Sequence, residues 1–224
     1  LELCYAVPCF GGVKHPINIR LSLDHMAYTI NHAKDKIIFF DDSVLPILER
    51  MYDRIKTTVE KFVYMSDKPG LPKTKIEPLY EYEALLKEQP ATFDWPYLDE
   101  DTYATLYYTT GTTGLPKGVL FTHRQIYLRT LHVLAIGGLA VRPTAEGATP
   151  RLGENAVNLV NTPLYHIHGW GVPFSHVFSA TKIVFPGRFS PESFCELVQT
   201  EKVTNAGVVP TMLAMLLEFK DLKK

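Results

Sequence analysis

Stretches with a helical spacing of apolar residues alternate along this chain with short, continuously apolar stretches. Leu23, Met26 and Ile30 fall on one face of a helix that begins after Ser22, a residue type that often caps helix N-termini. Residues 36–40 then form an apolar run typical of a buried strand, and the same alternation continues along the chain. Strands that alternate with helices predict an α/β fold, with mostly parallel sheets that carry helices on both faces.

The composition argues against several classes of protein. Lys and Arg total 23 against 24 Asp and Glu, a net charge of −1, so we expect no nucleic-acid partner. No uncharged apolar run reaches the ~20 residues that a membrane span needs. Cys4, Cys9 and Cys195 form no metal-type pair, and we expect them to be reduced, buried thiols in a cytoplasmic protein.

A segment rich in threonine and glycine lies between two predicted strands, residues 104–108 and 118–121. Glycines let the backbone approach a ligand and turn its N–H groups inward, while threonine hydroxyls add further donors. Lys117 adds a positive charge on a flexible stem. This combination predicts a cradle for a polyphosphate, here called the threonine-glycine loop (residues 109–117). Its expected phosphate-binding residues are Thr109, Thr110, Gly111, Thr112, Thr113, Gly114 and Lys117.

The threonine-glycine loop differs from the common nucleotide loop that connects a strand to a helix. That pattern requires a second glycine where this chain has Pro116, and a strand rather than a helix is predicted to follow. An unrelated phosphate-binding α/β protein would instead begin a helix at Pro116. A turn that binds no ligand is the simplest alternative interpretation.

Three segments carry a resemblance to a known family. These segments are similar in sequence and spacing to the acyl-adenylate-forming superfamily, and most resemble its medium- and long-chain fatty acyl-CoA synthetases. They are residues 108–119, continuing into Thr122-His123, residues 163–170 (Pro-Leu-Tyr-His-Ile-His-Gly-Trp) and residues 206–211 (Ala-Gly-Val-Val-Pro-Thr). The resemblance implies that the chain is part of the large, AMP-binding N-terminal domain of such an enzyme. Residues 1–100 would be a first βα half, and residues 101–224 the half with the loop and the acyl pocket. The small C-terminal domain is expected to be absent.

The family's chemistry implies roles for the loop. ATP and a carboxylic acid form an acyl-adenylate, and coenzyme A then accepts the acyl group. The resemblance implies that the loop grips the β- and γ-phosphates, that Thr109 touches Mg²⁺, and that Lys117 contributes to catalysis at the departing pyrophosphate. The implied partners are a fatty acid, ATP and coenzyme A, and family members often pair through their large domains. The family's adenine-binding, ribose-binding and hinge segments do not occur in these residues, and neither does the separate catalytic lysine of its small C-terminal domain. We therefore expect a fatty acid–CoA ligase as the parent protein and an inactive chain on its own.

Residues 163–170, here called the proline-histidine segment, resemble the lining of the family's acyl pocket. By resemblance, His166 lines the pocket shared by acyl group and adenylate and contributes to catalysis, Ile167 lies beside the acyl-adenylate, and Trp170 stands at the mouth of an acyl tunnel. Without the resemblance, His166 would be a structural histidine and Trp170 a core anchor. His168 and His176 have no such parallel, and no carboxylate or thiol accompanies them, so we expect no zinc site.

The same segment predicts an uncharged substrate. Relatives that activate amino acids carry an aspartate directly after the aromatic residue, where this chain has His166, and residues 155–181 contain no acidic side chain. A buried substrate ammonium would then lack a partner, which is energetically costly. A fatty acid is therefore favoured. A ligase for an aromatic acid and a non-catalytic nucleotide-binding module remain as alternatives.

Overall fold

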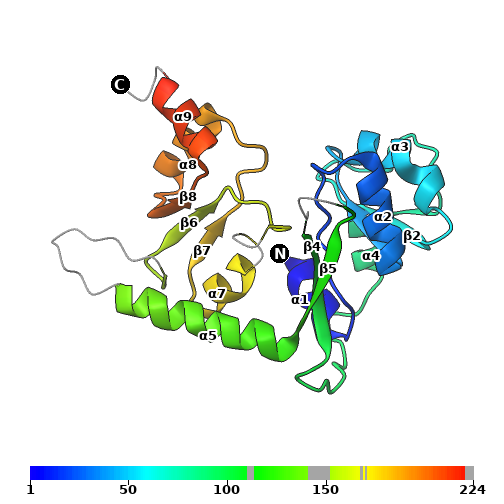
Figure 1. Cartoon of the computed structure of the whole chain (residues 1–224), viewed down its shortest axis with the longest axis horizontal. Coiled ribbons are helices and arrows are strands. Elements are labelled where there is room, and N and C mark those ends of the chain that lie inside the picture. Colours follow the sequence, from blue (N-terminus) through cyan, green and yellow to red (C-terminus); the bar gives the residue numbers. More distant parts are fainter. Residues whose placement is uncertain (110–113, 141–151, 167–168, 170, 220–224) are drawn as a thin grey trace. The chain divides into compact units, whose positions relative to one another are not determined.

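The computed structural model describes residues 1–109, 114–140, 152–166, 169 and 171–219 of the 224-residue chain (Figure 1). The chain divides into two compact units. We call Val7–Leu98 with Ala104–Leu120 the N-terminal unit. Leu1–Ala6, Asp99–Tyr103 and Phe121–Lys224 form the C-terminal unit.

The N-terminal unit contains a three-stranded parallel sheet with the order β1-β2-β3. Helix α2 (Leu23–Ala33) precedes β1 (Ile37–Phe40), and α3 (Leu45–Ile55) connects β1 to β2 (Lys61–Tyr64). Ser22 caps α2 by accepting a hydrogen bond from the His25 N–H, as its residue type predicts. The short edge strand β3 (Leu79–Glu81) leads directly into α4 (Tyr82–Lys87).

Helices cover both faces of this sheet. The strand register places Ile38 opposite Phe62 and Phe40 opposite Tyr64, so these four side chains share one face. That face packs against buried residues of α2 and α3 (Met26, Ala27, Ile30, Leu48, Met51 and Ile55). On the opposite face, the Phe39 ring contacts Tyr82 of α4 edge-on, with 6.2 Å between the ring centroids. The expected layering of helix, parallel sheet and helix is therefore confirmed in this unit.

Strands β4 (Tyr103–Thr109) and β5 (Lys117–Thr122) form a separate two-stranded sheet. Thr109 contacts Lys117 at one end of the pair, and the His123 N–H donates to the Thr102 carbonyl at the other. These two contacts make the pair an antiparallel hairpin, because a parallel crossover needs a dozen or more residues. The loop therefore joins two strands, as the sequence predicts, and no helix begins at Pro116.

Helix α5 (His123–Ala140) follows β5 and begins with a capping box. The Thr122 hydroxyl accepts from the Gln125 N–H at 3.3 Å, and the Gln125 side-chain oxygen accepts from the Thr122 N–H at 3.0 Å. These reciprocal bonds satisfy donors that an uncapped helix leaves unpaired. Thr122 and Gln125 thus match, in sequence and in structure, the Ser/Thr-x-x-Glu/Gln pattern of a capping box.

The C-terminal unit contains a second parallel sheet with the order β7-β6-β8. Its strands are β6 (Val157–Val160), β7 (Lys182–Val184) and β8 (Asn205–Gly207). Helix α7 (Val172–Phe178) lies between β6 and β7 in the chain, and α8 (Pro191–Thr200) between β7 and β8. Helix α9 (Pro210–Glu218) follows β8, and α1 (Glu2–Cys9) opens the chain. Parallel strands joined by helices confirm the predicted α/β fold.

The structure corrects two smaller expectations. The residue types of 79–88 favour one short helix, but Leu79–Glu81 form an edge strand because they pair with β2. All three cysteines are free; Cys4 is buried, whereas Cys9, the last residue of α1, is exposed and Cys195 is half-buried. In the part of the chain that is described, no helix combines the length and the apolar character needed to cross a membrane.

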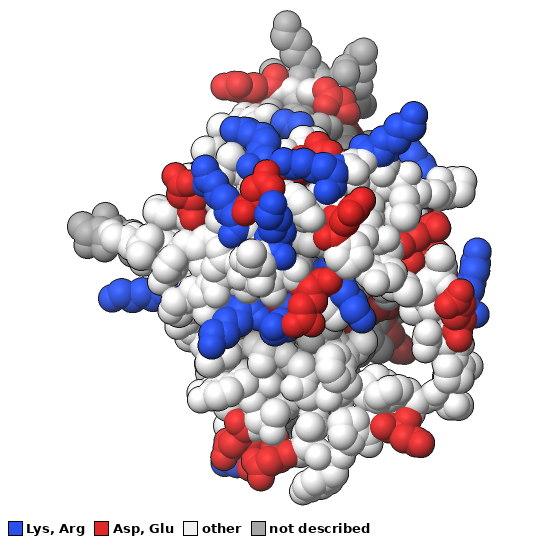
Figure 2. All heavy atoms as spheres, turned by 90° about the vertical axis from the view of Figure 1, so that its right-hand side faces the viewer, with Lys and Arg blue, Asp and Glu red and all other residues white. Residues whose placement is uncertain are grey.

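Figure 2 shows Lys and Arg side chains interspersed with Asp and Glu side chains on one face of the molecule, among many uncharged residues. Exposed ion pairs in the N-terminal unit join Lys36 with Glu60 at 2.7 Å, and Lys56 and Lys75 each with Asp53 at 2.9 Å. Hydrogen bonds from Lys56 and Lys75 and their positive charges lower the pKa of Asp53 to about 2. These exposed pairs contribute little to stability.

Candidate functional site

The two ends of the threonine-glycine loop meet at the neck of the β4–β5 hairpin. Thr109 is the last residue of β4 and Lys117 the first of β5, and the Thr109 hydroxyl donates to the Lys117 carbonyl at 3.4 Å. Both residues are exposed. The structure thus brings together the first and last residues predicted to bind phosphate. Thr110, Gly111, Thr112 and Thr113 lie outside the described residues.

Lys117 presents a positive charge at this neck. Among the residues that the structure describes, none forms an ion pair or side-chain hydrogen bond with its ammonium group. A lysine in that condition has three donors available for an incoming anion. Its charge and position suit the terminal phosphates of a nucleotide.

Gly114 determines the backbone conformation of the part of the loop that leads into β5. Its φ of +110° lies in a region that side-chain-bearing residues rarely adopt, and no heavy atom lies within 4 Å of where a Cβ would stand. The need for glycine here is therefore conformational rather than steric. Two residues later, Pro116 is buried beside the exposed Lys117. Pro116 is thus packed inside the protein, whereas the neighbouring Lys117 is accessible to solvent.

Metal binding by this chain was predicted only at Thr109. In the described ranges, no group of three or more histidine, cysteine or acidic side chains is placed to hold a metal ion. A single hydroxyl nevertheless fits Mg²⁺, which keeps several waters and binds mainly through the phosphates of its nucleotide. Thr109 would hold Mg²⁺ only together with ATP.

The residue before the loop, Tyr108, lies in an environment that sequence reasoning missed. Its hydroxyl is 2.7 Å from Nδ1 of His32, which is 76 positions earlier in the chain. Burial, the negative charge of Asp35 and nearby Tyr28 raise the pKa of Tyr108 to about 12, so the phenol stays neutral. No local pattern in the sequence signals a contact between residues so far apart.

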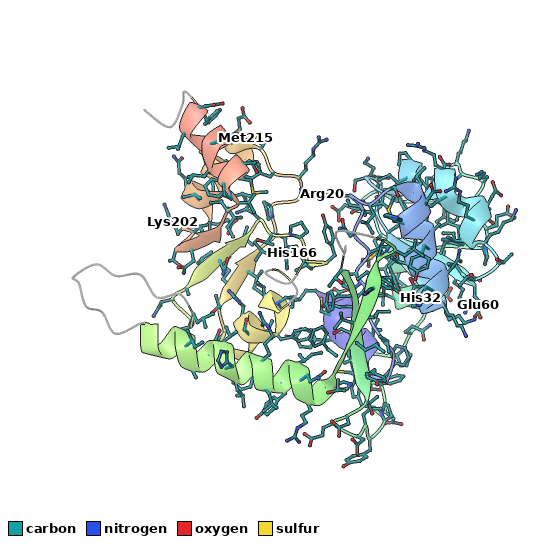
Figure 3. All side chains as sticks on the ribbon, viewed as in Figure 1. Arg20, His32, Glu60, His166, Lys202 and Met215 are labelled. Carbon is teal, nitrogen blue, oxygen red and sulfur yellow. The ribbon has the colours of Figure 1, made fainter. Side chains whose placement is uncertain are left out.

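The proline-histidine segment follows β6, the central strand of the second sheet. His166 lies in a tight turn, where its N–H donates to the Pro163 carbonyl at 3.0 Å and its own carbonyl accepts from the Gly169 N–H at 2.8 Å. The His166 side chain, marked in Figure 3, is exposed. Ile167, His168 and Trp170 lie outside the described residues, so their predicted roles stay predictions.

Gly169 permits this turn to close. A Cβ on Gly169 would lie 2.4 Å from the Pro163 carbonyl oxygen and 2.8 Å from the Thr162 carbonyl oxygen. Both neighbours are backbone atoms, which cannot move aside as a side chain would. The backbone therefore approaches itself more closely at Gly169 than any larger residue allows.

A network of buried polar groups begins at Gly171, directly after the proline-histidine segment. The Ser175 hydroxyl donates to the Gly171 carbonyl at 3.0 Å and lies 3.1 Å from Nδ1 of His176. The other ring nitrogen of His176 is 2.6 Å from the Asn158 amide nitrogen on β6. Burial lowers the pKa of His176, and the nearby charge of Arg129 lowers it further. The two ring nitrogens of His176 are thus both engaged within this network.

Two of the three family-like segments begin at the same sheet edge. Val160 at the end of β6 is paired with Gly207 at the end of β8, and the Asn161 amide donates to the Gly207 carbonyl at 3.2 Å. The proline-histidine segment and residues 206–211 therefore start side by side, at the edge of a parallel sheet where ligands commonly bind. The threonine-glycine loop belongs to the separate β4–β5 hairpin rather than to this sheet.

Comparison with known proteins gives a consistent result. A model of the AMP-binding enzyme family matches residues 1–224. The chain is 36% identical over 222 residues to a 3-methylmercaptopropionyl-CoA ligase from Ruegeria pomeroyi, covering 97% of this chain and 38% of that protein. It is also 36% identical over 220 residues to a long-chain-fatty-acid–CoA ligase from Thermus thermophilus, covering 98% of this chain and 37% of that protein. The chain thus spans less than two-fifths of the length of these relatives.

Solved structures share the fold. An anthranilate CoA ligase in complex with anthranoyl-AMP matches with a TM-score of 0.77 at 21% identity, over 97% of this chain and 39% of that one. An O-succinylbenzoate coenzyme A synthetase from Bacillus subtilis, in complex with ATP and magnesium ion, matches with a TM-score of 0.66 at 26% identity, over 97% of this chain and 39% of that one.

Proposed function

Because this chain belongs to the AMP-binding enzyme family, we propose that the protein containing it activates a fatty acid with ATP and transfers the acyl group to coenzyme A. In the first step, a carboxylate oxygen attacks the α-phosphorus, and the bond from that phosphorus to the pyrophosphate oxygen breaks. In the second step, the thiol of coenzyme A attacks the acyl carbonyl and AMP leaves. The products are AMP, pyrophosphate and an acyl-CoA.

One observation carries this proposal: an exposed lysine without a partner among the described residues stands across a hairpin neck from a threonine hydroxyl. Negative charge develops on pyrophosphate as it departs, and fixed donors aimed at that charge lower the barrier. We assign this role to Lys117 with residues 109–114 of the loop. Mg²⁺, touched by Thr109, would neutralise the phosphate oxygens when it arrives with ATP. The ATP and magnesium ion in the Bacillus synthetase support these two ligands.

We assign the proline-histidine segment to the acyl substrate. His166 would line the pocket and assist the chemistry, with Ile167 and Trp170 in contact with the acyl chain. The fatty-acid ligase among the relatives at 36% identity supports an aliphatic acid. The fold shared with an anthranilate ligase favours, as a second candidate, an aromatic acid as the substrate of the same reaction.

We further propose that this chain alone lacks synthetase activity. It spans 38% of the length of the Ruegeria ligase, and the adenine, ribose and hinge segments expected from the family do not occur in it. On this view it contributes residues 1–224 to a large domain, divided into the parts 1–100 and 101–224.

The test is ATP–pyrophosphate exchange by the full-length protein with hexanoate, octanoate, palmitate and benzoate, followed by thioester formation with coenzyme A. We expect exchange that depends on an aliphatic acid. Exchange with benzoate alone would show that the substrate is an aromatic acid rather than a fatty acid. Binding of ATP without exchange in the presence of any acid would favour a non-catalytic nucleotide-binding module. Robust exchange by the 224-residue chain itself would contradict the proposed inactivity.

A further inference from the structure

Two histidine side chains of the N-terminal unit contact Tyr108, the residue that precedes the threonine-glycine loop, and an aspartate pairs with one of them. They are His15, His32 and Asp35, which we call the Tyr108 bracket. None of them has a role in the proposed chemistry. All three lie far before Tyr108 in the sequence, and the fold brings them to the end of β4.

Backbone contacts place the first member of the bracket. The Lys14 N–H donates to the Ala104 carbonyl at 2.9 Å, and the Lys14 carbonyl accepts from the Leu106 N–H at 2.9 Å. Lys14 is thus paired with β4 in a parallel bridge to Thr105. His15, the next residue, is therefore fixed alongside the strand that carries Tyr108.

The end of α2 places the other two members. Lys34 terminates the helix in a left-handed conformation with φ of 58°, and the Asp35 N–H turns back to the Ile30 carbonyl at 3.1 Å. His32 lies in the last turn of the helix and is marked in Figure 3. Asp35 then meets His15, with 2.8 Å between Oδ2 and Nδ1, and their side chains are only 14% and 5% exposed.

The bracket holds both the ring and the hydroxyl of Tyr108. The His15 ring lies against the tyrosine ring with 5.1 Å between centroids, and His32 meets it edge-on at 5.9 Å. The hydroxyl is 2.7 Å from Nδ1 of His32. On the β5 side, a Cβ on Gly118 would lie 3.3 Å from Cζ of the ring. The ring therefore spans from the bracket to the strand that leaves the loop.

We propose that the Tyr108 bracket positions the threonine-glycine loop for the nucleotide, with His32, His15 and Asp35 acting through Tyr108 as positioning residues. This inference rests on the proposed function. A loop rich in glycine loses much conformational entropy when it orders around a ligand. Fixing Tyr108 fixes the residue beside Thr109 at one end of the loop, so less ordering remains for the nucleotide to impose.

His32 offers the sharper test, because its side chain is exposed at the surface whereas the His15–Asp35 pair is buried. We expect His32→Leu and Tyr108→Phe in the full-length protein each to raise the KM and the Kd for Mg·ATP about two- to tenfold, the effect of one hydrogen bond. The KM for the acid should stay unchanged. His32→Asn places an amide where Nδ1 stands and should restore ATP affinity, whereas His32→Gln should not. His25→Leu, on the same helix, is the matched control and should leave the KM unchanged.

A double-mutant cycle separates positioning from general destabilisation. If the hydrogen bond carries the effect, His32→Leu with Tyr108→Phe should weaken ATP binding no more than either change alone. Thermal melting checks that each variant folds. Unchanged ATP affinity in both single variants, or additive losses in the double variant, would overturn the inference. Exchange activity tests the proposed function separately. If the wild-type protein shows no exchange but His32→Leu still lowers its ATP affinity, the positioning role of the bracket stands and the proposed ligase activity is wrong.

Discussion

Replacing Lys117 with alanine is expected to slow acyl-adenylate formation without weakening the fold. Lys117 is exposed at the first position of β5, and within the described part of the chain its ammonium has no hydrogen-bond or ion-pair partner. Truncation therefore removes no contact of this kind, and the free energy of unfolding should change by less than about 0.5 kcal/mol. Any larger effect on rate must come from an interaction with substrate.

The expected size of that effect follows from the charge. A hydrogen bond between an ammonium and a phosphate oxygen contributes about 1.5–3 kcal/mol. If the bond is stronger in the transition state, where pyrophosphate carries more negative charge, its loss appears in the rate. At about 1.4 kcal/mol per tenfold, Lys117→Ala should reduce the rate of exchange about 10- to 150-fold.

The assay is ATP–pyrophosphate exchange by the full-length protein at saturating fatty acid. Lys61→Ala is the matched control, since Lys61 is also an exposed lysine at the first position of a strand. Lys117→Arg keeps the charge and should retain more activity than the alanine variant. If Lys117→Ala and Lys61→Ala exchange pyrophosphate at the same rate, the role assigned to Lys117 is wrong.

Three further predictions concern the second unit and its helices. Gly169→Ala should lower both thermal stability and acid-dependent exchange, because its Cβ would lie 2.4 Å from the Pro163 carbonyl oxygen; equal melting temperatures would refute this. Thr122→Ala should lower the free energy of unfolding by about 0.5–2 kcal/mol through loss of the cap on α5, measured by denaturant unfolding. Because the pKa of His176 is lower in the native state, the unfolded chain binds a proton more readily at acidic pH. Stability should therefore fall as the pH drops below about 6.5, the ordinary value, and His176→Asn should flatten that dependence.

Much of the fold was predictable because local signals agreed with the tertiary structure. Ser22 precedes a helix whose apolar positions Met26, Ala27 and Ile30 are all buried. Thr122 and Gln125 form their capping box within four residues, so no distant contact is needed. The turn chemistry of the loop likewise predicts two strands around it. Where local preference and packing coincide, sequence reasoning succeeds.

The rest depends on contacts between distant residues. Leu79 lies in a stretch whose local sequence favours a helix, but it pairs with Phe62 and so belongs to a three-residue edge strand. Such a strand is too short to leave a periodic signal. The contact between His32 and Tyr108 bridges 76 positions and has no local signature. For the site, the sequence predicted Thr109 and Lys117 as neighbours of one ligand, but it did not predict what holds them.

A crystal structure of the full-length protein with Mg²⁺ and a non-hydrolysable ATP analogue tests the central claim most directly. We predict that the β- and γ-phosphates lie within hydrogen-bond distance of the backbone and hydroxyl groups of residues 109–114 and of the Lys117 ammonium. A triphosphate bound elsewhere, with the hairpin neck between Thr109 and Lys117 open to solvent, would contradict it.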